Sequence, residues 1–179
     1  MGYIPSSGTP ELSLIATLTL SVASSFTFSS IPQTYSGLFL RLFCKKNETA
    51  GAGSALLVYL QANGSTGNPN NQMVVRATGT TMTVSDLASL GNGSVLGYAH
   101  ASDYSPYSLL EITIPDYASA VNHGVFTNYS TIGVNANGYS GIGQSYTTSA
   151  AAITSLTILV GSGLVNFTVG SKAYLYGIN

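Results

Sequence analysis

The chain has 179 residues, of which 45% are hydrophobic and only 6% are charged, and its formal net charge is -1. Soluble proteins carry about a quarter charged residues, so a surface this poor in charge is typical of a protein that packs against copies of itself or against partners. Five basic residues are too few for the clustered phosphate contacts of a nucleic-acid interface, and we expect no nucleic-acid partner.

The chain begins with a segment that lacks periodicity, and a clear strand pattern follows. Residues 1–10 show no alternation and are expected to form an N-terminal arm, which leaves residues 11–179 as one domain. From residue 12 to residue 22, apolar side chains alternate with Ser and Thr, as in a strand with one buried face. Glu11 precedes this run and no basic residue does, so we expect no signal peptide. No apolar run approaches the roughly 20 residues of a membrane helix, and we expect no membrane partner.

The next elements surround the only cysteine. Phe26 and Phe28 continue the alternation, residues 31–37 contain the Pro and Gly of a turn, and residues 38–45 form the next predicted strand. Cys44 lies in this apolar strand and has no second cysteine with which to form an internal disulfide. We therefore expect a buried thiol and a fold that is stabilised by packing.

The rest of the chain repeats short runs that are rich in β-branched and aromatic residues and bounded by Gly, Asn, Pro or Ser. These runs predict strands at residues 54–61, 72–78, 80–85, 94–99, 108–114, 124–134, 153–160 and 165–178. Between them, residues 85–91 and 115–124 have the capping and terminal residues of very short helices. Residues 62–71 and 135–146 are predicted to be long, polar, glycine-rich loops.

This order of elements restricts the fold class. About eight to eleven short strands without long helices cannot form a parallel sheet, because each parallel connection needs a dozen or more residues. Two packed antiparallel sheets bury the apolar faces of such strands between them. The sequence therefore predicts an all-β fold, an antiparallel β-sandwich of jelly-roll type or a related sandwich, with one or two very short helices.

Few residues of the sequence are suited to carry chemistry. The glycine-rich stretches lack the strand-then-helix setting and the Lys of a phosphate-binding loop. His100 and His123 are the only histidines, so a metal site would have to recruit Asp103, Asp116 or Cys44 from other parts of the fold. We expect hydrogen-bonded histidines at the surface or at an interface, no metal and no cofactor.

A glycosidase needs two carboxyl groups at a defined separation, one as acid and one as base or nucleophile. Leu110, Ile112 and Ile114 share one face of their predicted strand, and Glu111 points to the other. A residue that faces solvent or a neighbouring subunit is favoured over a catalytic acid. We predict that the protein is not an enzyme; a glycan-cleaving enzyme that depends on Glu111 or Asp103 is the third alternative.

The twelve tyrosines carry a different signal. Tyr98, Tyr104 and Tyr107 lie around one predicted turn, and Tyr139 and Tyr146 lie in another. Tyrosine supplies a large, rigid contact area with a polar tip, and it is enriched at protein interfaces. We therefore take these five residues as interface candidates, although the same rings are suited to stacking on a saccharide.

Several segments together resemble a group of tailed-bacteriophage virion proteins with jelly-roll folds. These segments are residues 26–38 (FTFSSIPQTYSGL), 114–117 (IPDY), 152–158 (AITSLTI), 166–167 (NF) and 170–178 (GSKAYLYGI). A Gly-X-Trp that often precedes the late strand of that group is missing here, and Tyr146 is the nearest substitute. The resemblance implies a jelly roll and a role in the virion, in the head or in the tail, and it carries over no catalytic residues.

Composition and resemblance together lead to a structural role. We expect a capsid decoration or cement protein, a homotrimer that bridges subunits of the major capsid protein on the particle exterior after synthesis in the host bacterial cytoplasm. The alternative is a tail or fibre component that binds a host surface saccharide through residues 135–146 and the tyrosines around Tyr104.

Overall fold

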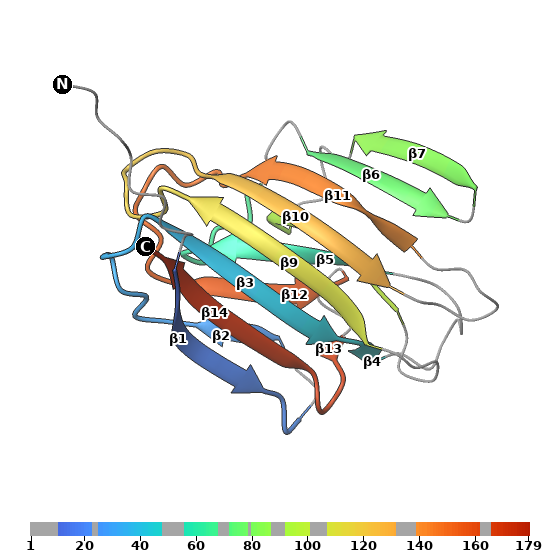
Figure 1. The fold of residues 1–179 in the computed structure, drawn as a ribbon, viewed down its shortest axis with the longest axis horizontal. Coiled ribbons are helices and arrows are strands. Elements are labelled where there is room, and N and C mark those ends of the chain that lie inside the picture. The colour runs from blue at the N-terminus through green and yellow to red at the C-terminus, as the bar shows by residue number, and fades with distance from the viewer. Residues whose placement is uncertain are drawn as a thin grey trace.

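The computed structural model describes residues 11–22, 25–47, 56–67, 72–78, 80–86, 92–100, 107–131, 139–161 and 166–179. Within these ranges the chain is all-β and contains no helix (Figure 1). The described strands are β1 (Leu12–Thr19), β2 (Phe26–Phe28), β3 (Gly37–Cys44), β4 (Lys46–Asn47), β5 (Leu56–Ala62), β6 (Met73–Thr78), β7 (Thr81–Asp86), β8 (Ser94–Ala99), β9 (Ser108–Pro115), β10 (Gly124–Thr131), β11 (Tyr139–Tyr146), β12 (Leu156–Val160), β13 (Asn166–Phe167) and β14 (Lys172–Ile178).

The strand pairing confirms the predicted jelly roll. Of the described strands, eight form a larger sheet in the order β1-β14-β3-β9-β10-β11-β6-β7, and four form a smaller sheet in the order β2-β12-β5-β8. β1 pairs with β14, β2 with β12, β3 with β9 and β5 with β8, all antiparallel. The chain is thus doubled back on itself, and successive pairs alternate between the two sheets, which is the wrapping of a jelly roll.

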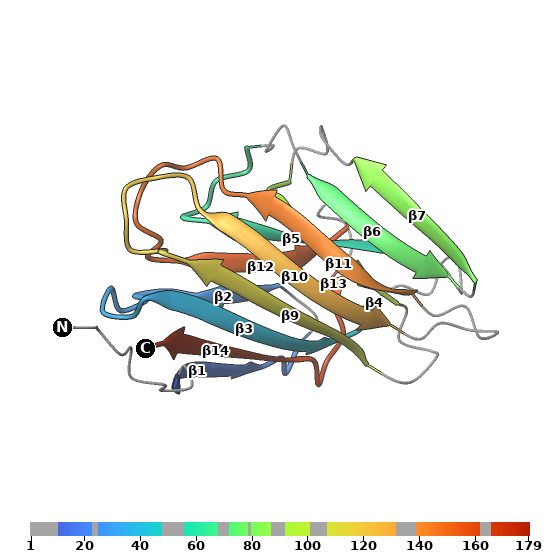
Figure 2. The same cartoon turned by 45° about the horizontal axis from the view of Figure 1, so that its top comes forward.

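Two insertions widen the larger sheet beyond this wrapped core. The hairpin β6–β7 is inserted between β5 and β8, and the hairpin β10–β11 follows β9 before the chain reaches β12. Both hairpins add to the same side of the larger sheet, next to β9. Among the described strands β7 pairs only with β6, and Figures 1 and 2 show it at the far edge of the sheet.

Several local predictions differ from the structure. The described part of the chain has fourteen strands and not eight to eleven, because residues 139–146 of the predicted loop form β11 and the short β4 and β13 pair separately. The predicted helix at 115–124 is absent: Pro115 ends β9, and the φ of Asp116 is +51°, which is outside the helical region. Ser85 and Asp86, expected to begin a helix, belong to β7, and residues 87–91 lie outside the described part.

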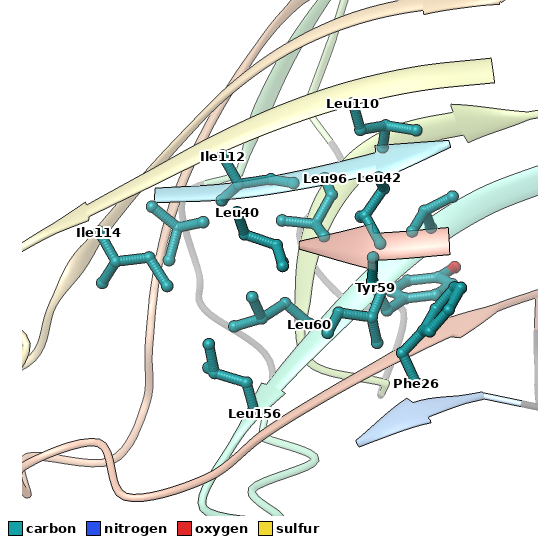
Figure 3. Close-up of a cluster of buried hydrophobic side chains, with 14 of the residues drawn as sticks. Phe26, Leu40, Leu42, Tyr59, Leu60, Leu96, Leu110, Ile112, Ile114 and Leu156 are labelled. Atoms are coloured by element: carbon teal, nitrogen blue, oxygen red, sulfur yellow. The ribbon is translucent and has the colours of Figure 1, made fainter. Parts of the chain in front are cut away.

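The hydrophobic core fills the space between the two sheets (Figure 3). Leu40 and Ile112 reach into it from the larger sheet, and Leu60, Leu96 and Leu156 reach into it from the smaller sheet. Full burial of one such side chain contributes about 1.5 to 3 kcal/mol. The alternation that predicted these strands is therefore the pattern that places their apolar side chains in the core.

Four of the segments that carry the phage-protein resemblance meet at one end of the sandwich, whereas residues 166–167 pair with β4. A Cβ atom on Gly177 would overlap the ring of Tyr35, so the glycine lets that ring rest on the backbone of β14. The backbone N–H of Ile153 donates to the carbonyl of Tyr117 at 2.8 Å, and the Tyr117 hydroxyl donates to the carbonyl of Pro32. In this chain those motifs hold the ends of strands together, which is a packing role.

Candidate interaction surface

The side chains of the larger sheet that point away from the smaller sheet form one broad surface, which we call the outer face. Cross-strand neighbours lie on the same side of a sheet. Its central row therefore runs through Thr17, Tyr174, Arg41, Glu111, Asn128, Ile142, Val75 and Val84. In Figure 1 the larger sheet lies in front of the smaller one, so that this face is turned toward the viewer.

The outer face exposes large apolar side chains along its whole width. Those classed as exposed are Leu12, Leu14, Phe43, Met73, Met82, Val84, Phe126 and Ile142. The aromatic pairs Phe39–Tyr176 and Phe43–Tyr174, with centroids 6.0 and 6.1 Å apart, bridge β3 and β14 on the same side. Exposed large apolar side chains on many strands of one sheet face mark an interaction site.

One ion pair lies in the middle of this surface. Arg41 on β3 donates from Nε and Nη2 to Oε1 of Glu111 on β9, at 2.9 and 2.6 Å. The guanidinium carbon lies 5.6 Å from the ring centroid of Phe39. The two charges therefore neutralise each other within the chain, and both side chains are partly exposed, so the pair contributes at most about 1 kcal/mol. Glu111 points outward, as its sequence position predicted.

A shallow hollow lies beside this ion pair, with a volume of about 260 Å³. Phe39, Glu111, Phe126 and Ile142 are among the residues that line it, from four neighbouring strands of the larger sheet. Small-molecule pockets typically measure about 300 to 1,000 Å³. The hollow is below that range and open on the outer face, so it is better suited to a side chain of a partner protein than to a separate ligand.

Four of the five predicted interface tyrosines lie among the described residues. Tyr139 and Tyr146 lie at opposite ends of β11, and Tyr139 is paired with Tyr98 of β8, with ring centroids 5.7 Å apart. Tyr107 is exposed just before β9, where Lys45 Nζ lies 4.5 Å from its ring centroid. Tyr104 lies outside the described residues. An interface role for these residues stays a prediction.

Arg76 and His100 complete the cluster around Tyr98 and Tyr139. The Arg76 guanidinium carbon lies 4.8 Å from the ring centroid of Tyr139 and 5.5 Å from that of Tyr98. The imidazole of His100 stacks on Tyr139 at 5.3 Å with an interplanar angle of 13°. Burial, and then the nearby Lys46, lowers the pKa of His100. The rings are thus already packed against side chains of their own chain, which reduces the area that they offer to a saccharide.

The other residues considered for chemistry are dispersed. The two histidines were expected at the surface or at an interface, but both are buried in the single chain. His123 Nε2 lies 3.1 Å from the carbonyl oxygen of Ala151, while Nε2 of His100 has no hydrogen-bond partner in the described structure. Asp103 lies outside the described residues. Among the residues that are described, no three His, Cys, Asp or Glu side chains gather as metal ligands would.

The sequence analysis did not predict the residues of the outer face as an interaction surface, although the sequence contains a pattern that indicates them. Phe39 and Phe43 alternate with the buried leucines of β3, and Tyr174 and Tyr176 alternate with buried residues of β14. Aromatic residues on the side opposite the core indicate a second buried surface. The strand register that joins these positions into one face cannot be read along a single strand.

Comparison with known proteins does not indicate a function for this surface. Neither the models of protein families nor the curated protein sequences contain a match to this chain. The described residues also include no helix that is long and apolar enough to cross a membrane.

Proposed function

We propose that the protein is a multi-copy structural component of a tailed-bacteriophage particle, a decoration or cement protein on the outside of the capsid. The observation that carries the proposal is the outer face, a broad sheet surface that exposes many aromatic and aliphatic side chains and whose central ion pair is satisfied within the chain. Such a surface loses little hydration when it is buried. The resemblance to virion jelly-roll proteins supplies the kind of assembly.

A cement protein works by adding contact area between subunits that would otherwise separate. A rigid jelly roll, held over a junction of the major capsid protein, would add such area without any chemical step. The low charge of this chain suits that role, because few charged groups would have to be desolvated or matched. The protein would then raise the internal pressure that the head withstands.

The test compares heads that carry the protein with heads purified from a phage that lacks it. DNA release on heating is followed with an intercalating dye, and purified protein is added back to the deficient heads. We expect add-back to raise the release temperature and the protein to sediment with the heads. An unchanged release temperature with no sedimentation would contradict the proposal.

The alternative is a tail or fibre component that binds a host surface saccharide. The exposed ring of Tyr107 favours it, because an exposed aromatic ring is suited to stacking on a sugar. A glycan array and a cell-adsorption assay with the purified protein separate the two functions. Binding to cells or glycans that Tyr107→Ala abolishes, without binding to heads, would favour the tail component.

A further inference from the structure

We infer that a second copy of this chain covers the outer face, so that copies associate through their larger sheets. The inference deepens the proposed function and rests on it, since it names the contact through which copies on the particle would associate. Two identical faces that meet form a two-fold pair, so this contact replaces the homotrimer expected from the sequence. Three features of the described residues lead to this occupant: the charge of the face, its area, and the shape of its centre.

The charge of the outer face suits a copy of itself. Of the side chains that the structure describes there, Arg41, Glu111 and Lys172 are charged, and the first two form an ion pair with each other. Lys172 lies toward the margin, where β14 pairs with the end of β1. The outer face has no strong electrostatic potential that a highly acidic or basic partner could complement. Two nearly neutral faces, in contrast, meet without like-charge repulsion.

The area of the outer face is that of a stable protein interface. Its eight described strands, spaced about 4.8 Å apart, span about 38 Å, and strands of about seven residues at about 3.3 Å each span about 23 Å. The face therefore covers roughly 900 Å², compared with about 800 Å² per partner in a standard interface. One further copy is large enough to cover it.

The shape of the face also fits a protein surface of the same kind. Sheets stack face to face about 10 Å apart, with side chains of each reaching between those of the other. The hollow beside Glu111 and Phe126 would receive a projecting side chain from the opposing copy. At the far edge, β7 presents Met82 and Val84, and among the described strands only β6 pairs with it.

The experiment measures the oligomeric state and uses matched charge insertions. Ile142 lies in the central row of the outer face and is 53% exposed, and Val169 in the turn before β14 is 55% exposed and lies off that face. We expect the unmodified protein to be an oligomer by light scattering. Ile142→Lys should raise the dissociation constant about 100-fold or more, because an unpaired charge would be buried, whereas Val169→Lys should leave it unchanged.

A second measurement asks directly whether the face is covered. Met73 and Met82 are exposed on the outer face of the single chain. In the oligomer their oxidation by dilute hydrogen peroxide should be slowed at least about tenfold relative to the Ile142→Lys variant. Circular dichroism and the melting temperature of that variant show that it is folded.

The outcomes separate this inference from the proposed function. An unmodified protein that is monomeric at all concentrations overturns the inference, and if that monomer still binds heads, the cement role survives. An oligomer that persists in Ile142→Lys, or methionines that are equally reactive in both proteins, also overturns it. Dissociation by Ile142→Lys alone, together with methionine protection, supports it.

Discussion

The only thiol of the chain shows how burial controls the chemistry of a single residue. Cys44 is fully buried on β3, and burial raises the pKa of its thiol to about 12. At pH 8, about one thiol in ten thousand would then be ionised, and the thiolate is the reactive form. The prediction from sequence of a buried cysteine is confirmed.

Thiol labelling tests this state. In the folded protein at pH 8, we expect Cys44 to react with a disulfide reagent at least about a thousandfold more slowly than a free cysteine, and at the ordinary rate in denaturant. The labelled fraction is measured by mass spectrometry over time. Rapid labelling under native conditions would show that β3 opens or that the thiol is accessible.

Tyr129 predicts how stability depends on alkaline pH. Burial, and then the neighbouring Tyr98, raises the pKa of Tyr129 to about 12, against the opposing effect of Arg76. The folded protein therefore holds this proton more tightly than the unfolded chain, whose tyrosine pKa is about 10. The contribution to stability is complete below pH 10 and is lost as the pH rises toward 12.

Urea unfolding at pH 8, 10 and 11.5 measures this contribution in the protein and in Tyr129→Phe. The variant lacks a hydroxyl that donates to the Val75 carbonyl at 3.2 Å, so it should be about 1 kcal/mol less stable at pH 8. That deficit should shrink between pH 10 and 11.5. A difference that is constant with pH would contradict the assignment of the raised pKa.

Residue-level roles were predictable only where a single strand determines them. The outward direction of Glu111 follows from alternation within β9 and is observed. Its partner Arg41 lies 70 residues earlier and reaches it through the register of β3 against β9. The approach of Arg76 to Tyr98 and Tyr139 likewise joins three strands. Long-range register decides such contacts, and local pattern does not contain it.

Among the elements, β11 shows how a glycine-rich strand can be mistaken for a loop in the sequence. Residues 135–146 were predicted to be a loop because they are polar and glycine-rich, yet Tyr139–Tyr146 pairs along its whole length with β10. A Cβ atom on Gly141 would overlap the carbonyl oxygen of Val75 and lie 2.7 Å from the Tyr129 hydroxyl oxygen. Glycine at this position therefore lets neighbouring groups approach the backbone closely. Composition alone does not reveal this role, because a glycine-rich segment indicates a loop.

Two glycines of β11 provide a matched test. Gly141→Ala should destabilise the protein by about 3 kcal/mol or more, because the added methyl group meets backbone and a buried ring. Gly143→Ala, two residues along the same strand, should change the free energy of unfolding by less than about 1 kcal/mol, since its nearest neighbours would lie at 3.7 Å. Urea unfolding of both variants gives the comparison, and equal effects would contradict the observed β11–β6 pairing.

At the scale of the whole molecule, the fold class was predictable and the wrapping was suggested only by the resemblance. Short runs with a period of two, separated by turn residues, predict two antiparallel sheets, and the structure confirms them. The nested pairing of β2 with β12 and β3 with β9 joins segments more than a hundred and about seventy residues apart. No local pattern specifies such pairs, because they depend on which faces fit together after collapse.

Because the two sheets share one core, we expect a substitution at a central core position, Leu40, to lower the stability of the whole molecule. Leu40 is buried between the sheets, so Leu40→Ala should lower the free energy of unfolding by about 2 to 5 kcal/mol. Val121→Ala, at a half-exposed position after β9, should change it by less than about 0.5 kcal/mol. Both are measured by urea unfolding at one protein concentration, because association would itself add stability. Similar losses in both variants would contradict a core at this place.

The pairing of β1 with β14 sets the order in which the protein can be completed during synthesis. Among the described strands, β1 has no other neighbour, and β14 is also the strand that separates it from β3. A ribosome that adds about 5 to 20 residues per second needs roughly 8 to 30 s to travel from one strand to the other. Throughout that interval the uncharged strand β1 lacks its hydrogen-bonding neighbour. The nascent chain can therefore mispair through β1 until β14 emerges.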